Sequence, residues 1–107
     1  MKPLLLTTIL SLSLLATQSA RAADYHVSSD GRFGCADKDY FKKIVTIAAQ
    51  GDQAAFKKTL LSGLSGGVCT LFEDGEPVYL VKAGFASVKI RRAGDTKEYW
   101  TNRETIK

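Results

Sequence analysis

Apolar residues in this chain follow a helical spacing first and an alternating spacing afterwards. The first helical stretch begins after Asp37, a good N-cap residue, and ends at Gly51. Its apolar residues recur at i, i+3, i+4 and i+7: Phe41, Ile44, Val45 and Ala48. Asp52 can cap a second helix, in which Phe56, Leu60 and Leu64 share one face. The short Gly51-Asp52 joint therefore predicts an antiparallel helical pair within residues 35–65.

From position 68 onward, short apolar runs are separated by glycine-containing turns. Val88 and Ile90 point to one side of an extended segment while Lys89 and Arg91 point to the other, which is typical of a half-buried strand. The sequence predicts four strands: 68–72, 77–81, 87–92 and 98–101. Strands this short cover their edges most economically by closing, so we expect a small antiparallel β-barrel over residues 66–107.

The N-terminus has the pattern of a secretory signal peptide. Lys2 precedes a short apolar run over residues 4–16, and the triplet at 20–22 (Ala-Arg-Ala) is a suitable cleavage site. The alternative is a membrane anchor, but a spanning helix needs roughly 20 apolar residues. We therefore expect residues 1–22 to be removed, a periplasmic or secreted mature chain starting at Ala23, and no stable membrane insertion afterwards.

Residues 23–34 are polar, contain glycine and show neither period, so we expect them to form a flexible arm. Removing the signal peptide leaves 13 basic residues against the 11 acidic ones. A charge that small does not suggest a nucleic-acid partner. Four lysines on the helical pair have the spacing of an ordinary solvated face: Lys42, Lys43, Lys57 and Lys58.

Two cysteines, Cys35 and Cys69, allow one intramolecular disulfide, which we expect in an exported chain. A metal pair is the alternative, but zinc takes three or four ligands and His26 is the only histidine. Redox catalysis usually shows a Cys-x-x-Cys spacing, which this chain lacks. The disulfide would close a loop of about 35 residues, for which the chain-entropy model gives roughly 3.5 to 4 kcal/mol. A small domain would depend on that contribution, because its core supplies little net stability.

Three segments of the second half form a recognisable pattern: Gly-Glu-Pro-Val-Tyr-Leu at 75–80, Ala-Ser-Val-Lys-Ile-Arg at 86–91 and Tyr-Trp-Thr at 99–101, with Gly94 between the last two. This pattern resembles that of bacterial SH3-like domains, and the resemblance covers about residues 67–106. This chain lacks the usual opening segment of that family, and the helical leader is not part of the family pattern. The whole order is also similar to small exported proteins of conjugative plasmids and mobile elements. The resemblance implies that the barrel is SH3-like. Together with the predicted helices and disulfide, it leads us to expect an α+β fold in which an N-terminal helical pair packs on a small SH3-like antiparallel β-barrel as one compact domain, closed by one disulfide.

Catalysis is not indicated by the residues. Nucleophilic or acid–base chemistry needs a positioned set of the Ser/His/Asp or Cys/His kind. His26 lies in the expected arm, and the carboxylates Glu73, Asp74 and Glu76 lie in a predicted turn, where acidic residues are common. We expect no enzyme activity, no metal and no cofactor.

The residues favour a binding surface over a catalytic site. Aromatic residues and arginines cluster in the predicted barrel: Tyr79, Phe85, Tyr99, Trp100, Arg91 and Arg92. Alternation separates Tyr99 from Trp100, so either one of them faces out or Trp100 packs under the helices. We expect Lys89 and Arg91 to be exposed and to form a ligand surface with whichever of Tyr99 and Trp100 faces out.

These observations predict a non-catalytic binding module of the bacterial envelope that recognises a protein, peptide or cell-wall glycan as a monomer or weak oligomer. Conjugation or secretion machinery is a candidate setting for it. A small exported toxin or an immunity-type inhibitor is the alternative. Neighbouring conjugation genes would favour the first function, and growth arrest on periplasmic expression would favour the second.

Overall fold

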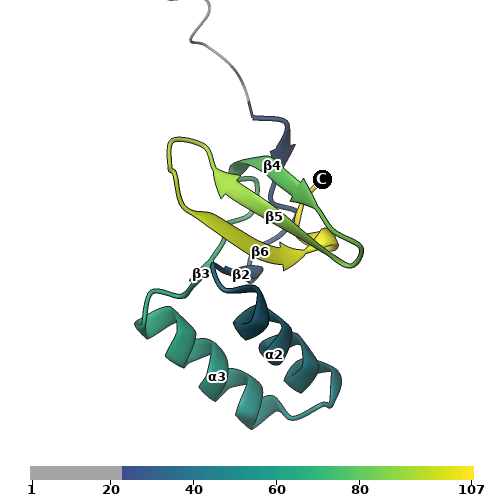
Figure 1. Cartoon of the computed structure of the whole chain (residues 1–107), viewed down its shortest axis with the longest axis vertical. Coiled ribbons are helices and arrows are strands. Elements are labelled where there is room, and N and C mark those ends of the chain that lie inside the picture. The colour runs from purple at the N-terminus through teal and green to yellow at the C-terminus, as the bar shows by residue number, and fades with distance from the viewer. Residues whose placement is uncertain (1–22) are drawn as a thin grey trace, which may run out of the picture.

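A computed structural model describes residues 23–107 of the chain. The predicted signal peptide, residues 1–22, lies outside the described residues. In the part that is described, no helix is both long enough and apolar enough to cross a membrane. Figure 1 shows a layer of helices below a sheet.

The helical pair is confirmed with the boundaries that its caps predicted. Helix α2 spans Lys38–Ala49 and helix α3 spans Gln53–Ser65. The Asp37 carboxylate accepts from the Tyr40 N–H, and the Asp52 carboxylate accepts from the Ala55 N–H, each at 3.0 Å. Gly51 joins the helices with a φ of 76°, a conformation that glycine adopts without steric cost.

A six-stranded antiparallel sheet forms the second layer, so the α+β class is confirmed. Its strands are β1 (Tyr25–His26), β2 (Phe33–Cys35), β3 (Cys69–Leu71), β4 (Pro77–Ala83), β5 (Ser87–Arg92) and β6 (Glu98–Asn102). A single 3-10 turn, η1 (Arg103–Thr105), follows β6. The sheet order is β1-β4-β5-β6-β2-β3. β1 and β3 occupy the two ends of that order without pairing with each other, so the expected closed barrel is not confirmed.

The expected arm at 23–34 contains regular structure instead. Tyr25 and His26 pair with Val78 and Pro77, Val27 is fully buried, and β2 begins at Phe33. Two strands therefore precede the helices, and the helical pair is an insertion between β2 and β3 rather than the N-terminal element. The strands are two and three residues long. A period cannot be recognised in so few residues, and their partners lie more than thirty positions away in the chain.

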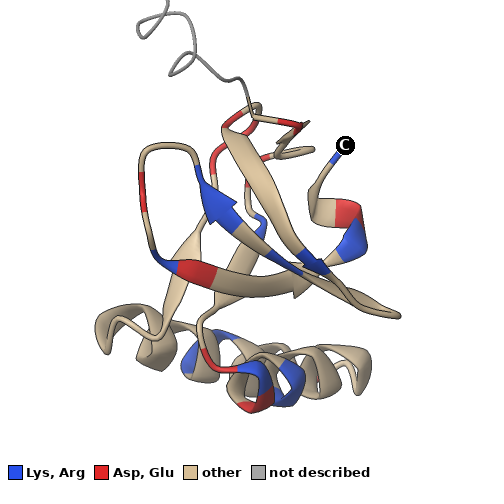
Figure 2. Cartoon of the chain, turned by 45° about the horizontal axis from the view of Figure 1, so that its top comes forward, with Lys and Arg blue, Asp and Glu red and all other residues tan. Residues whose placement is uncertain are grey.

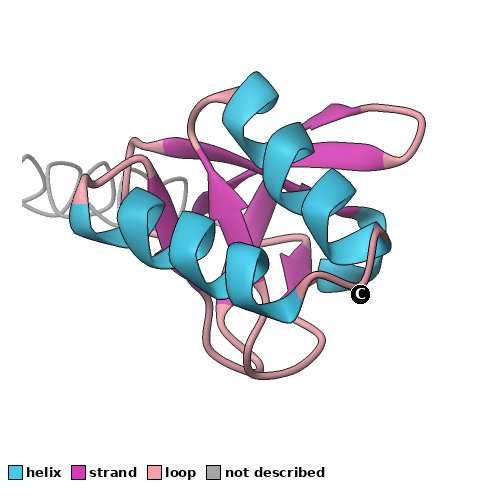
Figure 3. Ribbon diagram, turned by 90° about the horizontal axis from the view of Figure 1, so that it is seen from below, coloured by secondary structure: helices cyan, strands magenta, loops and turns pink. Residues whose placement is uncertain are grey.

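Two hydrophobic cores lie on opposite faces of the sheet. The first lies on the face turned away from the helices: Val27, Phe72, Val78, Val88, Ile90 and Tyr99. The second lies between the sheet and the helices, which cross the strands in Figure 3: Cys35, Phe41, Ile44, Cys69 and Trp100. β6 contributes to both, because alternation sends Tyr99 into the first core and Trp100 into the second.

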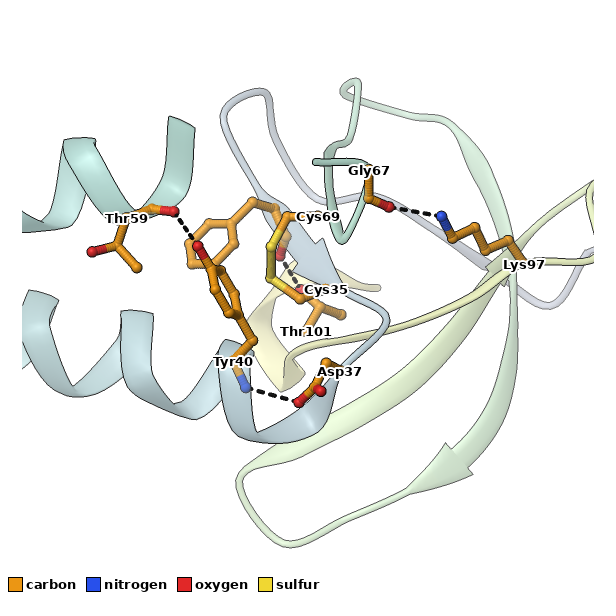
Figure 4. Close-up of a disulfide and its surroundings, with 9 residues drawn as sticks. Cys35, Asp37, Tyr40, Thr59, Gly67, Cys69, Lys97 and Thr101 are labelled. Atoms are coloured by element: carbon orange, nitrogen blue, oxygen red, sulfur yellow. Dashed lines mark hydrogen bonds between the residues drawn. A yellow bond between two sulfur atoms is a disulfide. The ribbon is translucent and has the colours of Figure 1, made fainter. Parts of the chain in front are cut away.

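The disulfide between Cys35 and Cys69 is confirmed, and Figure 4 shows its surroundings. The two residues are register partners on β2 and β3, and both are buried. Gly63 of α3 is packed against this bond, since a Cβ at that position would lie 2.6 Å from the Cys69 Sγ. Tyr40 joins the helices on the other side by donating from its hydroxyl to the Thr59 carbonyl at 2.7 Å.

The Arg92 side chain connects β5 to β3 and to Glu76, the residue before β4. Its guanidinium pairs with Glu76, donates to the Thr70 hydroxyl at 3.0 Å and donates to the Leu71 carbonyl at 2.6 Å. It also lies over the Phe72 ring, 4.9 Å from the centroid. Side-chain bonds from β5 thus hold β3 in place where no backbone ladder joins the two strands.

Candidate functional site

The predicted binding residues Lys89 and Arg91 lie on one face of β4–β6, which we call the basic face. Register pairing places Lys82 and Trp100 on either side of Lys89, and places Tyr79 and Glu98 on either side of Arg91. The basic face consists of Tyr79, Lys82, Lys89, Arg91, Glu98 and Trp100. Figure 2 shows the basic positions along β5. The sequence thus predicted correctly that Lys89 and Arg91 share a face, but both are half-buried rather than exposed.

Neither of the predicted aromatic residues is exposed. Tyr99 points into the first core and is 6% exposed, so it does not belong to the basic face. Trp100 belongs to that face but is 7% exposed, because α2 packs over it. The expectation that one of the two faces out is therefore wrong, and the alternative that Trp100 packs under the helical pair is confirmed. A sheet covered on both faces leaves no solvent side for β6 at these positions.

Two residues that the sequence did not assign to the site lie at the basic face: Tyr79 of β4 and Lys38 of α2. The Arg91 guanidinium lies over the Tyr79 ring at 4.5 Å from the centroid. Lys38, the first residue of α2, brings its Nζ to 4.6 Å from the centre of the Trp100 ring, which Lys89 approaches at 5.4 Å. The strand register could have indicated Tyr79, whereas Lys38 reaches the face only through tertiary packing.

The charges of the basic face are incompletely balanced. Lys89 pairs with Glu98 at 3.3 Å, and both side chains are partly exposed. Lys82 lies directly opposite Lys89, and two like charges in that arrangement destabilise a sheet. Arg91 is half-buried and donates to the Asp95 carbonyl at 2.8 Å. Because the cations exceed the carboxylate on this face, the surface favours an anionic partner.

The turn after β5 is organised by Asp95. Its carboxylate accepts from the backbone N–H groups of Lys97 and Thr96, and these bonds lower the pKa of the carboxyl below its usual value. The Lys97 ammonium in turn donates to the Gly67 carbonyl at 2.8 Å. This turn therefore holds its conformation beside the Arg91 end of the basic face.

An open pocket of about 300 Å³ adjoins the other end of the basic face. It lies between α2 and the ends of the strands and is lined by Phe41, Lys42, Val45, Thr46, Ala86, Ser87 and Asn102. Ser87 and Asn102 are register partners, two positions along from Lys89 and Trp100. The pocket therefore continues the basic face toward the β4–β5 hairpin.

The hairpin tip presents Phe85 with its whole surface exposed. The Arg103 guanidinium donates to the Gly84 carbonyl at 2.6 Å and to the Phe85 carbonyl at 3.3 Å. The Arg103 N–H also donates to the Ala86 carbonyl, at 3.4 Å. These bonds tether the backbone of the turn that carries Phe85 and that leads into the pocket residue Ala86.

The remaining candidates serve structural contacts. Asp30 accepts from the Asp74 N–H at 2.8 Å, and Glu76 accepts from the Glu73 N–H at 2.9 Å. His26 exchanges backbone bonds with the C-terminal residue. In the part of the chain that the structure describes, no group of three or more histidine, cysteine or acidic residues is arranged to hold a metal ion.

No family model, curated protein or solved structure matches the chain. The case for a function therefore rests on the basic face and the adjoining pocket. Ammonium and guanidinium groups beside aromatic rings bind carboxylates through charge-assisted hydrogen bonds, and an apolar pocket binds an apolar side chain.

Proposed function

We propose that this protein is an exported, non-catalytic binding module that captures an acidic segment of a partner protein on its basic face. The observation that carries the proposal is the surplus of cations on that face, above all Lys82 directly opposite Lys89. The cost of placing like charges opposite each other is offset when an anion binds between them.

An SH3-like arrangement of the strands is part of the same proposal. His26 donates to the Lys107 carbonyl at 3.0 Å and accepts from its N–H at 2.9 Å, while Ser28 donates to the Thr105 carbonyl at 2.7 Å. These bonds bring the C-terminal residues beside β1, on the side away from β4. They support an SH3-like small barrel whose loop between β1 and β4 carries the helical insertion. An experimental structure compared strand by strand with SH3-like domains tests this assignment.

Binding of a fluorescein-labelled octaglutamate peptide to the oxidised protein, followed by fluorescence anisotropy, tests the basic face. Lys82→Glu is expected to weaken binding about tenfold, or about 1.4 kcal/mol. Lys82 is exposed, so the thermal midpoint should stay nearly constant. Arg91→Glu should weaken binding at least as much, but it also removes the bond to the Asp95 carbonyl.

Lys58→Glu is the matched control, because it makes the same charge change on an exposed position of α3. Equal losses in Lys82→Glu and Lys58→Glu would show that the peptide responds to net charge alone and would contradict the proposal. Binding of soluble peptidoglycan fragments but not of the acidic peptide would instead identify a cell-wall glycan as the ligand.

A further inference from the structure

The pocket beside the basic face is large enough for an aromatic or branched aliphatic side chain. An apolar cavity of about 150 Å³ accommodates benzene, and this pocket measures about 300 Å³. Phe41 and Val45 form its helical wall, and its other side is lined by Ala86, which directly follows the exposed Phe85 in the chain. The Lys42 side chain at its margin adds a cation to a mainly apolar site.

The strand register sets the distance between the pocket and the cations. Ser87 in the pocket, Lys89 and Arg91 follow one another at intervals of two residues on one face of β5. Each interval is roughly 6.6 Å, at about 3.3 Å per residue. An extended peptide repeats its same-side side chains at the same interval, so successive side chains on one side of it match the pocket, Lys89 and Arg91 in turn.

We propose that the pocket and the basic face together form one peptide groove, which selects a segment with an apolar anchor and carboxylates two and four residues away from it. The anchor occupies the pocket and contacts Phe85, and the carboxylates meet Lys89 and Lys82 and then Arg91. This inference rests on the proposed function and adds a ligand motif to it. Charge complementarity supports the carboxylates, and the volume and lining of the pocket support the anchor.

The test uses fluorescein-labelled peptides and the oxidised protein. The matching peptides are Phe-Gly-Asp-Gly-Asp and its reverse, since a peptide can bind along the groove in either chain direction. One comparison peptide replaces phenylalanine with alanine, and another, Phe-Asp-Asp-Gly-Gly, keeps the composition but changes the spacing. At least one matching peptide is expected to bind tenfold or more tightly than both comparison peptides.

Two variants locate the anchor. Thr46→Trp places a large ring at the exposed margin of the pocket, and its matched control is Ala49→Trp on an exposed position of the same helix. Phe85→Ser removes the exposed ring, and its control is Leu61→Ser, which removes a side chain that is 60% exposed on α3. Thr46→Trp and Phe85→Ser should each lower affinity for the matching peptide at least fivefold, and the controls less than twofold.

The outcomes separate this inference from the proposed function. If the matching and comparison peptides bind equally and Lys82→Glu weakens them all, the basic face binds acidic segments and the groove inference is overturned. If the alanine peptide binds as well as the matching one while Thr46→Trp has no effect, the pocket is not the anchor site. If none of the peptides and no octaglutamate bind, both proposals fail.

Discussion

Gly63 offers the sharpest test of the packing around the disulfide, because two opposing effects act at one position. In an exposed helix, Gly→Ala stabilises by about 1 kcal/mol through its helix propensity. Gly63 is buried, however, and a Cβ there would lie 2.6 Å from the Cys69 Sγ and 2.9 Å from the Tyr40 ring. Overpacking of this kind costs about 1 to 3 kcal/mol.

Neither neighbour of Gly63 can move aside easily. The Cys69 sulfur is bonded to Cys35, and the Tyr40 hydroxyl donates to the Thr59 carbonyl. We therefore take the upper part of the overpacking range and expect Gly63→Ala to lower the free energy of unfolding by about 2 kcal/mol. For a domain of this size, that corresponds to a fall in the thermal midpoint of about 10 °C.

Urea unfolding of the oxidised protein, followed by tryptophan fluorescence, measures the effect. Ser62→Ala is the control, because that exposed neighbour should show only a small gain in helix propensity. In a Cys35→Ala/Cys69→Ala background the sulfur is absent, so the cost of Gly63→Ala should shrink, which a double-mutant cycle detects. If Gly63→Ala raises the free energy of unfolding of the oxidised protein, as the same substitution does at an exposed helix position, the close packing of α3 on the disulfide is refuted.

Three further predictions concern the disulfide, the leader and the turn after β5. Cys69→Ala should lower the free energy of unfolding by about 2 to 5 kcal/mol, and Cys35→Ala by the same amount, whereas two reactive thiols in the native protein would refute the bond. Intact mass of protein recovered from the periplasm should correspond to a chain starting at Ala23, within one residue, and a mass that retains the first 22 residues would contradict export with cleavage. The Asp95 carboxyl, whose charged form accepts from the Lys97 N–H, should titrate in NMR below the ordinary range for aspartate. Because the pKa of Asp95 is lower in the folded state, the stabilisation that its carboxylate supplies is present above the unfolded pKa and is lost as pH falls through the folded pKa. A normal or raised titration midpoint for Asp95 would contradict this prediction.

The local sequence pattern was sufficient to predict an element where the element is long or where its ends carry capping residues. The caps at Asp37 and Asp52 and the glycine at position 51 gave the helices their boundaries, since these bonds are made within four residues. The alternation of Val88, Lys89, Ile90 and Arg91 predicted which side of β5 is buried, because the period of a strand is intrinsic to its backbone.

The candidate site could be predicted only in part, because it depends on contacts between elements as well as on local pattern. Lys89 and Arg91 share a face by alternation alone. Their aromatic neighbour depends on which strands are adjacent, so Tyr79 was not assigned to the face, and neither Tyr99 nor Trp100 is the exposed aromatic residue that was expected. The pocket between α2 and the β4–β5 hairpin has no sequence signal, since its walls come from three separate segments.

The amino-acid sequence by itself determined the helical pair, the main strands and the pairing of the only two cysteines, because each depends on local hydrogen bonding or on a choice with one solution. Tertiary structure decided that β1 and β2 join the sheet, that the helices are inserted between β2 and β3, and that Trp100 is buried beneath α2. Those outcomes depend on contacts between residues far apart in the chain. β1 and β2 are also too short to show a period. The burial of both Tyr99 and Trp100 on β6 follows from the same packing, because one core lies on each side of this strand.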